Sequence, residues 1–232
     1  MPASVLWVAL RTGGLVVGGF DDTDEMVGFL FGVTGFVDGQ PTHWSDMLAV
    51  HPRVRGQGIG RALKEFQRDT LLRRGVQHVR WTFDPLECRN AHLNFARLGI
   101  TSSEYIPNCY GDSASPLHAG LATDRLVANW LLSSERVSSR MEGGERGPNA
   151  EAVAALLLIN EGGEPELELT APRLRLRVPA DIQALKQLDR AAAVAWREST
   201  RAAFTTYFAR GYEAVEFVRE PSGVGCYVLQ RR

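Results

Sequence analysis

The chain has 232 residues, of which 44% are hydrophobic and 23% charged, and its formal net charge is −1. This length supports a hydrophobic core without metals or disulfides, and the low net charge argues against nucleic acid as the main partner, because phosphate recognition needs a cationic face. No apolar stretch reaches the roughly 20 residues of a membrane span. The three cysteines (Cys88, Cys109, Cys226) are odd in number and widely spaced. They predict neither a zinc site nor a disulfide framework and favour a reducing, cytoplasmic setting.

The first half of the chain alternates between strand and helix patterns. Short apolar runs bounded by Gly, Asp and Pro predict strands, and apolar residues recurring every three or four positions predict helices. In chain order we expect a helix at 2–11, strands at 15–20, 25–34 and 42–50, a helix at 58–74, a strand at 78–83, a helix at 89–98 and a strand at 103–110. The buried stripe predicted for the helix at 58–74 is Ile59, Ala62, Leu63, Phe66, Thr70 and Leu71, with Lys64 among the residues off the stripe.

The second half begins with a stretch rich in serine, glycine and charge, which is typical of a flexible linker at 133–150. Beyond it we expect strands at 153–159 and 167–178, a helix that Asp181 caps, and a helix at 199–210. The chain ends in a predicted hairpin, 214–218 with 225–229. The expected domains are therefore 1–132, the linker 133–150, and a C-terminal α/β extension at 151–232.

The segment Arg55-Gly56-Gln57-Gly58-Ile59-Gly60 joins a predicted strand to a predicted helix. The first amides of a helix have no partner within the helix, and the positive end of the helix dipole lies behind them, so the segment suits a pyrophosphate. Its spacing differs from the dinucleotide-binding pattern, and no Gly-Lys-Ser/Thr follows as in a P-loop. The alternative interpretation is a glycine turn that binds no ligand.

The flanking residues carry a family resemblance. The stretch MLAVHPRVRGQGIGRAL resembles the cofactor-binding signature of the GNAT acetyltransferase superfamily, with Leu48, Val50, Pro52, Arg55, Gly58 and Gly60 at its characteristic positions. The resemblance implies an acyl-CoA, usually acetyl-CoA, whose pantetheine lies along the strand that ends at Val50. The cofactor-binding residues expected are Leu48, Val50, Arg55, Gly56, Gln57, Gly58, Ile59, Gly60 and Arg61, and also Asn90, which is about as well explained as a helix cap.

Further stretches, TFDPLECRNAHLNFARLG, YIPNCYG, GLATDRLVANW and WRESTRAAFTTYFARGY, resemble an uncharacterised bacterial branch of the same superfamily. The resemblance implies an α/β fold, a mixed and centrally antiparallel sheet flanked by helices and splayed where CoA enters, with the C-terminal extension packed on it. The chain departs from the family pattern in two ways. The usual opening strand is missing before the first hairpin, and Phe95 replaces the tyrosine that commonly protonates the leaving thiolate.

Direct transfer needs a base for the acceptor amine and a donor to the thioester oxyanion. Backbone amides near Leu48 to Val50 are the expected donors. Asp46 is the preferred base because strand alternation places it on one face with Trp44 and Leu48; His43 and His92 are the rivals. Each also has a purely structural interpretation. Asp46 is then a solvated carboxylate, His43 an exposed histidine near a turn, and His92 a packed histidine. Other polar candidates are Glu87, Tyr105 and Tyr110, and Arg89 and Arg125 for an acidic substrate.

The sequence therefore predicts an N-acetyltransferase, or short-chain N-acyltransferase, that acts on the amine of a small molecule or peptide. We expect no metal, no nucleic acid and no membrane among its partners, and a homodimer stays open. One alternative is a non-catalytic acyl-CoA-binding regulatory or scaffold protein that lost its chemistry with the tyrosine. Another is an interaction module in which the extension is the working surface.

Overall fold

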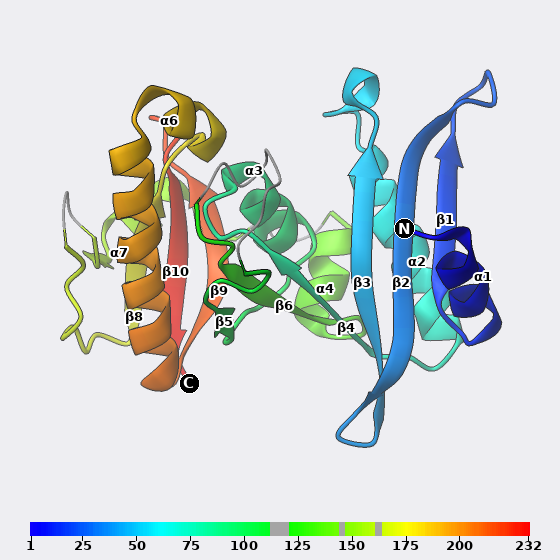
Figure 1. Ribbon diagram of the computed structural model, residues 1–232. Coiled ribbons are helices and arrows are strands. Elements are labelled where there is room, and N and C mark those ends of the chain that lie inside the picture. The colour runs from blue at the N-terminus through cyan, green and yellow to red at the C-terminus, as the bar shows by residue number, and fades with distance from the viewer. Residues whose placement is uncertain (112–120, 144–146, 161–163) are drawn as a thin grey trace. The chain divides into compact units, whose positions relative to one another are not determined.

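The computed structural model describes residues 1–111, 121–143, 147–160 and 164–232 (Figure 1). The chain divides into two compact units, one comprising Met1–Trp81 and Asn129–Glu142, the other Thr82–Ala128 and Gly143–Arg232. This division differs from the expected boundary near residue 132, because residues 82–128 group with the C-terminal part. The described residues form two sheets, with strand orders β1-β2-β3-β4-β6-β5 and β7-β8-β10-β9.

The first unit is built on a long antiparallel meander. It consists of α1 (Ala3–Arg11), β1 (Leu15–Phe20), β2 (Met26–Val37), β3 (Gln40–Val50), the 3-10 turn η1 (Pro52–Val54), α2 (Ile59–Arg73) and α4 (Glu135–Met141). The first residues of β4 (His78–Phe83) and the last of β6 (Arg125–Leu131) complete it. β1 pairs with β2 and β2 with β3 in antiparallel register, whereas β3 and β4 are parallel. The expected mixed sheet with an antiparallel centre is confirmed.

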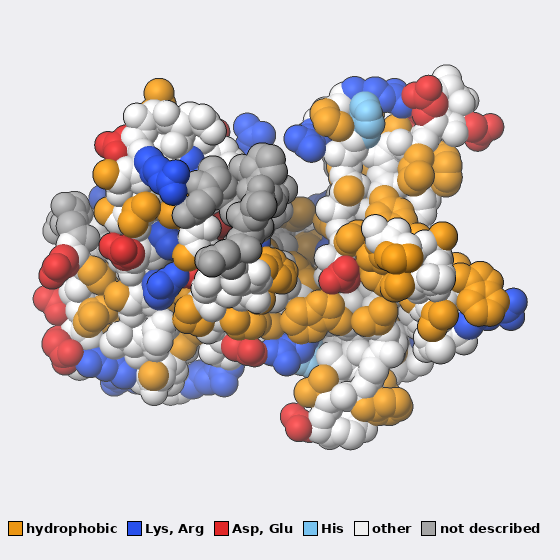
Figure 2. Space-filling model, viewed as in Figure 1, with side chains coloured by type: hydrophobic (Ala, Val, Ile, Leu, Met, Phe, Trp, Pro, Cys, Tyr) orange, Lys and Arg blue, Asp and Glu red, His pale blue; other side chains and the backbone are white. Residues whose placement is uncertain are grey.

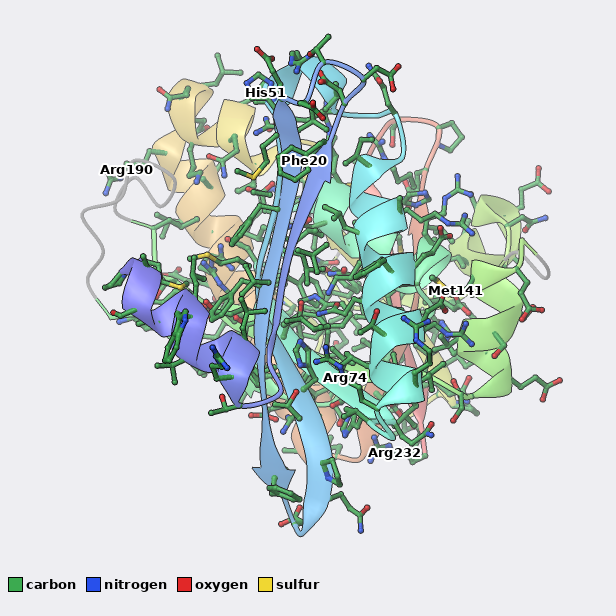
Figure 3. The ribbon with its side chains drawn as sticks, turned by 90° about the vertical axis from the view of Figure 1, so that its right-hand side faces the viewer. Phe20, His51, Arg74, Met141, Arg190 and Arg232 are labelled. Atoms are coloured by element: carbon green, nitrogen blue, oxygen red, sulfur yellow. The ribbon has the colours of Figure 1, made fainter. Side chains whose placement is uncertain are left out.

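Helices cover both faces of this meander. In Figure 3 the outer edge of the sheet faces the viewer, with α1 on one side of the strands and α2 on the other. α1 buries only Ala9, and its apolar side chains Val5, Trp7, Val8 and Leu10 are exposed; Figure 2 shows them as a hydrophobic area. α2 buries Leu63 and Leu71 against the sheet, and Gly75, with a φ of 76°, ends it where the sequence predicts.

The second unit contains a four-stranded sheet and the helices that pack on it. Its elements are α3 (Cys88–Ala91), the π-helical segment η2 (His92–Arg97), β5 (Tyr105–Ile106), α5 (Ala150–Ala154), β7 (Leu157–Leu158), β8 (Arg173–Val178), α6 (Ile182–Leu188), α7 (Arg190–Ala209), β9 (Tyr212–Arg219) and β10 (Gly225–Arg231). The rest of β4 and β6 also belongs to it. Asp181 caps α6 by accepting from the amides of Gln183 and Ala184, as its position predicts.

Within this unit the C-terminal hairpin packs on residues 82–128. Tyr227 of β10 meets the Phe95 ring edge-on at 5.6 Å between centroids, and its hydroxyl donates to the Pro85 carbonyl at 2.8 Å. Helix α7 adds two ion pairs four residues apart, Arg197 with Asp84 and Arg201 with Asp124. Residues 82–128 therefore depend on the C-terminal part for much of their packing.

Several expected elements differ from the structure. The strand predicted at 153–159 begins with the last two residues of helix α5, Val153 and Ala154, and only Leu157–Leu158 pair as a strand. The helix predicted at 199–210 is the second half of α7, which begins at Arg190 after its Asp189 cap. The stretch expected as a linker contains α4, capped by Ser134, and residues 144–146 of it lie outside the described residues. Serine and charge suit a partly buried helix such as α4 as well as a linker, so composition alone does not separate them.

Candidate acyl-CoA site

The segment after β3 forms a compact turn that leads directly into α2. Gly56 and Gly58 have φ angles of 82° and 87°, and Gly58 is the N-cap of α2. A Cβ atom at either position would meet no other atom within 4 Å, so there is space for a side chain. Glycine is favoured at both positions because of the positive φ angles, which other residues adopt at a steric cost. Gly60 is different, because its φ is not positive and a Cβ there would lie 3.6 Å from the Val50 side chain, an ordinary contact.

The amide groups at the start of α2 are available to a ligand. The amides of Val54, Arg55 and Gln57 are used by hydrogen bonds within the turn, and the first helical bond runs from the Ala62 amide to the Gly58 carbonyl at 3.0 Å. Among the described residues, none accepts from the amides of the four positions Gly58 to Arg61. The first turn of this 15-residue helix has no acidic residue, so these donors are suited in geometry and charge to accept an anion.

The two arginines beside this turn have different roles. Arg55 is exposed and donates through Nε to the Val50 carbonyl at 3.3 Å, which leaves the end of its guanidinium towards solvent. The Arg61 guanidinium is already engaged, because its Nε donates to Glu65 at 2.7 Å and its Nη2 donates to the Met141 carbonyl at 2.6 Å. It is therefore not directed at a ligand on the glycine turn. His51, which begins the turn, lies at one end of the unit among basic side chains (Figures 2 and 3).

The second half of β3 offers a free backbone edge. Pairing with β4 covers only Thr42 to Trp44, while β3 runs on to Val50. The His51 amide donates to the Val27 carbonyl, so alternation along the antiparallel ladder makes Ala49 and Met47 the next residues that bond β2. The peptide groups of Leu48 and Val50 therefore face the opposite edge, consistent with the Arg55 bond to Val50.

A β-bulge lies at the predicted base, Asp46. Ser45 pairs with Gly32 and Met47 with Phe31, so Asp46 is an extra residue without a partner in β2, and it is exposed. Trp44 pairs with Val33 and Leu48 with Leu30, and residues three apart on β2 lie on opposite faces. The predicted sharing of one face by Trp44 and Leu48 is therefore wrong, because the bulge interrupts the alternation.

His43 is enclosed in the first unit. It is fully buried, its Nδ1 lies 2.9 Å from the Thr34 hydroxyl, and its Nε2 is among the buried nitrogens that have no partner in the described residues. Burial, reinforced by Lys64 and Arg74, lowers the pKa of His43 to about 4, so the imidazole is neutral at neutral pH. A neutral imidazole is a suitable base, but this one has no exposed surface from which to reach a substrate.

The other predicted site residues belong to the second unit. His92 is half-buried in η2, and burial, followed by Arg97 and Arg219, lowers its pKa; Asn90 is exposed on α3. Phe95 is wholly buried between the Phe83 and Tyr227 rings. The Tyr105 hydroxyl donates to Asp124 at 2.6 Å, and burial raises its pKa, whereas Tyr110 is exposed and bonds Thr82.

The sequence patterns miss a polar cluster beneath β3. Lys64 and Gln67 are buried on α2, and Phe66, which was predicted to be buried, is 51% exposed. The buried positions Leu63, Lys64, Gln67, Thr70 and Leu71 follow helical spacing, so the buried face is rotated relative to the predicted stripe. The prediction placed Phe66 on the buried face because it is hydrophobic and its neighbour Gln67 is polar. Helical spacing from Leu63, Thr70 and Leu71 is equally consistent with a buried Gln67.

Some classes of site and segment are not found in the part of the chain that the structure describes. No cluster there has three or more His, Cys, Asp or Glu side chains placed to hold a metal ion. No helix in the described ranges combines the length and apolar character needed to cross a membrane.

Several solved acetyltransferase structures are similar to part of the chain. A nourseothricin acetyltransferase has 20% identity and a TM-score of 0.40 over 48% of this chain, which spans 61% of that protein. A GNAT family acetyltransferase from Elizabethkingia anophelis, solved with acetyl-CoA bound, has 15% identity and a TM-score of 0.45 over 56% of this chain and 83% of its own. The ribosomal-protein-S18-alanine N-acetyltransferase of Escherichia coli has 24% identity and a TM-score of 0.41, over 52% and 70%.

No curated protein sequence matches the chain. The model of one domain family, described as an acetyltransferase (GNAT) domain, matches residues 2–99. That match includes the glycine turn, the start of α2 and the free edge of β3 described above. Residues 2–99 are therefore similar to the acetyltransferase domain of the GNAT superfamily.

Proposed function

We propose that this protein transfers an acetyl or short acyl group from acyl-CoA to the amine of a small molecule or peptide. The observation that carries the proposal is the row of unpartnered amides from Gly58 to Arg61, which follows directly on the free edge of β3. A pyrophosphate fits the amides, and an extended pantetheine fits the edge, where the peptide groups of Leu48 and Val50 face outward. The similarity of residues 2–99 to an acetyltransferase domain supports the same assignment.

The chemistry proposed for these residues is direct transfer. Asp46, exposed at the adjacent bulge, accepts a proton from the substrate ammonium, and the neutral amine then attacks the thioester carbonyl carbon. The Leu48 amide donates to the thioester oxygen as negative charge develops on it, and the nitrogen loses its second proton to solvent. The new C–N bond forms as the C–S bond breaks, and the CoA thiolate leaves. Since Phe95 is buried and apolar, solvent supplies the proton that the thiolate takes.

The experiment is a thiol-release assay with acetyl-CoA and a panel of small amines and peptides, together with calorimetric titration of CoA. Thiol release that depends on an added amine, with mass-spectrometric detection of the acylated amine, supports transfer. A matched reaction without amine corrects for hydrolysis. If CoA binds but no amine is acylated, the non-catalytic acyl-CoA-binding alternative, which the buried Phe95 favours, replaces this proposal. If CoA does not bind, both are wrong.

A further inference from the structure

A lysine without a carboxylate partner is buried under the first turns of α2. Lys64 is 2% exposed, and its ammonium nitrogen lies 2.9 Å from the Ser45 hydroxyl and 3.1 Å from Gln67 Oε1. The same nitrogen lies 3.8 Å from the centroid of the Trp81 ring and 5.7 Å from that of Trp130. No described carboxylate forms an ion pair with it. Two aromatic faces and two neutral acceptors therefore replace a counter-ion.

This group, which we call the Lys64 junction (Lys64, Ser45, Gln67, Trp81 and Trp130), joins the two parts of the candidate site. Lys64 lies four residues, or about 6 Å along the axis, after Gly60, so its stem starts just behind the unpartnered amides. Ser45 immediately precedes the bulge at Asp46, where β3 has left β4 and its free edge begins. Gln67 also bonds Ser45, through Nε2 at 3.2 Å. The junction thus fixes the start of α2 relative to that edge.

We propose that Lys64 is a positioning residue of the anion site and that its side chain takes up a proton when a pyrophosphate binds at the start of α2. The inference rests on the proposed acyl-CoA site. An anion bound at the start of the same helix favours the ammonium form of a buried amine, because charges interact with little screening inside a protein. None of the residues of the Lys64 junction carries a negative charge. The bound anion therefore provides the counter-charge for the Lys64 ammonium.

The surroundings of Lys64 leave few other groups to carry such a proton. β3 contributes Ser45 and His43, α2 contributes Gln67, β4 contributes Trp81 and β6 contributes Trp130. Of these only His43 titrates, and its pKa of about 4 keeps it neutral near pH 7. Burial alone lowers the pKa of Lys64 to about 7, so its proton is exchangeable in the neutral range.

The test measures protons together with affinity. Dephospho-CoA is the probe, because its pyrophosphate is a diester with no group that titrates near neutrality. Calorimetric titrations just above neutrality in HEPES and in Tris, which differ in ionisation enthalpy, give the protons taken up on binding. The protein is expected to take up a fraction of a proton and to bind more tightly as pH falls. Lys64→Met is expected to abolish the uptake and to weaken binding about tenfold.

Two further variants separate positioning from general stability. Lys186→Met removes the lysine at position 186 on α6, and is expected to keep both affinity and proton uptake. Ser45→Ala keeps the ammonium and removes its hydroxyl partner, and is expected to retain the uptake while binding several-fold more weakly. Because Lys64→Met removes a buried unpaired charge, it is expected to lose affinity without losing thermal stability, a combination that a purely structural role does not produce.

The outcomes that decide the inference are distinct. If the parent protein binds dephospho-CoA with no proton uptake, or if Lys64→Met binds it with unchanged affinity and uptake, the role of Lys64 is wrong while the acyl-CoA site stands. If the parent protein binds neither dephospho-CoA nor CoA, the proposed function itself fails. Ser45→Ala binding as tightly as the parent protein removes the positioning part of the proposal.

Discussion

The ammonium nitrogen of Lys64 lies 3.8 Å from the centre of the Trp81 ring, inside a protein core that offers it no carboxylate in the described residues. Because burial lowers the pKa of Lys64 from 10.5 to about 7, the folded protein binds fewer protons than the unfolded chain between these values. The free energy of unfolding should therefore rise with pH from about 7 towards 10.5 through this group.

Lys64→Met should flatten that pH dependence. Below about pH 7 the parent protein buries an unpaired ammonium, so the variant is expected to be the more stable protein, and the advantage should shrink as pH rises. Urea unfolding of both proteins across this range measures the difference. A parent protein whose stability falls through the same range would contradict the assignment.

Gly58→Val should remove CoA binding. Gly58 has a φ of 87°, and a branched residue there costs more than the roughly 1–2 kcal/mol of an ordinary left-handed residue and displaces the amides that follow. Gly35→Val is the matched control, since Gly35 has open space for a Cβ and no positive φ. Calorimetry with CoA compares the two, and circular dichroism checks that both are folded. Equal CoA affinity in Gly58→Val and the parent protein would place the pyrophosphate elsewhere.

Asp46→Asn should lower the turnover rate by about 100-fold or more and leave cofactor affinity nearly unchanged, as expected for removal of a general base. Asp22→Asn, at an exposed acid in the turn after β1, is the control for a lost surface charge. The measurement is a thiol-release assay with saturating acetyl-CoA and an amine found to be a substrate. Full activity in Asp46→Asn would transfer the role to another residue or to water.

Asp84→Asn should destabilise the second unit by about 3–5 kcal/mol, because it leaves a buried guanidinium unpaired. Arg197 is 2% exposed, its Nη2 bonds both oxygens of Asp84, and Nε and Nη1 have no described partner. Adding Arg197→Met should recover part of the loss, which denaturant unfolding would show. Glu168→Gln, at the exposed pair with Arg210, should change stability by less than about 0.5 kcal/mol.

A fragment of residues 1–133 should aggregate or fail to fold cooperatively. Residues 82–128 would lose Tyr227, Arg197 and Arg201, and with them aromatic packing and two ion pairs. We therefore propose that the C-terminal extension folds as one cooperative unit with the transferase part. Size-exclusion chromatography and thermal unfolding of the fragment test this, with the full chain alongside. A soluble, monomeric and cooperatively folded fragment would show that the extension is an independent module.

Much of the first hundred residues could be predicted from local patterns. The strands at Leu15–Phe20 and His78–Phe83 match the expected limits, and α2 differs by one residue at each end. Each of these segments has a clear hydrophobic pattern and is bounded on at least one side by glycine or an Asp-Pro pair. Its local sequence preference therefore agrees with the structure that it adopts in the fold. The glycine turn could also be predicted, because it needs positive φ angles at Gly56 and Gly58 and glycine adopts these without a steric penalty.

The parts that could not be predicted depend on distant contacts. β6 contains the polar residues Arg125 and Asn129, which obscure its strand pattern. The burial of Lys64 could not be predicted from the helix sequence. The aromatic rings that stabilise its buried ammonium, Trp81 and Trp130, lie on strands β4 and β6, far away in sequence. The bulge at Asp46 is likewise a property of the β2–β3 pair, and strict alternation within β3 misassigns the faces beyond it.

That bulge also governs how β3 tolerates changes of length. The pairs on either side of Asp46, Ser45 with Gly32 and Met47 with Phe31, are already consecutive along β2. Deleting Asp46 would therefore leave every pair from Met47 to Val50 in place and remove only the extra residue with its carboxylate. A deletion at 47 to 49 would instead shift the free edge by one residue and exchange the peptide groups it presents. Position 46 is thus a place where the chain can gain or lose a residue, and the carboxylate proposed as the base, without shifting the strand pairs from Met47 to Val50.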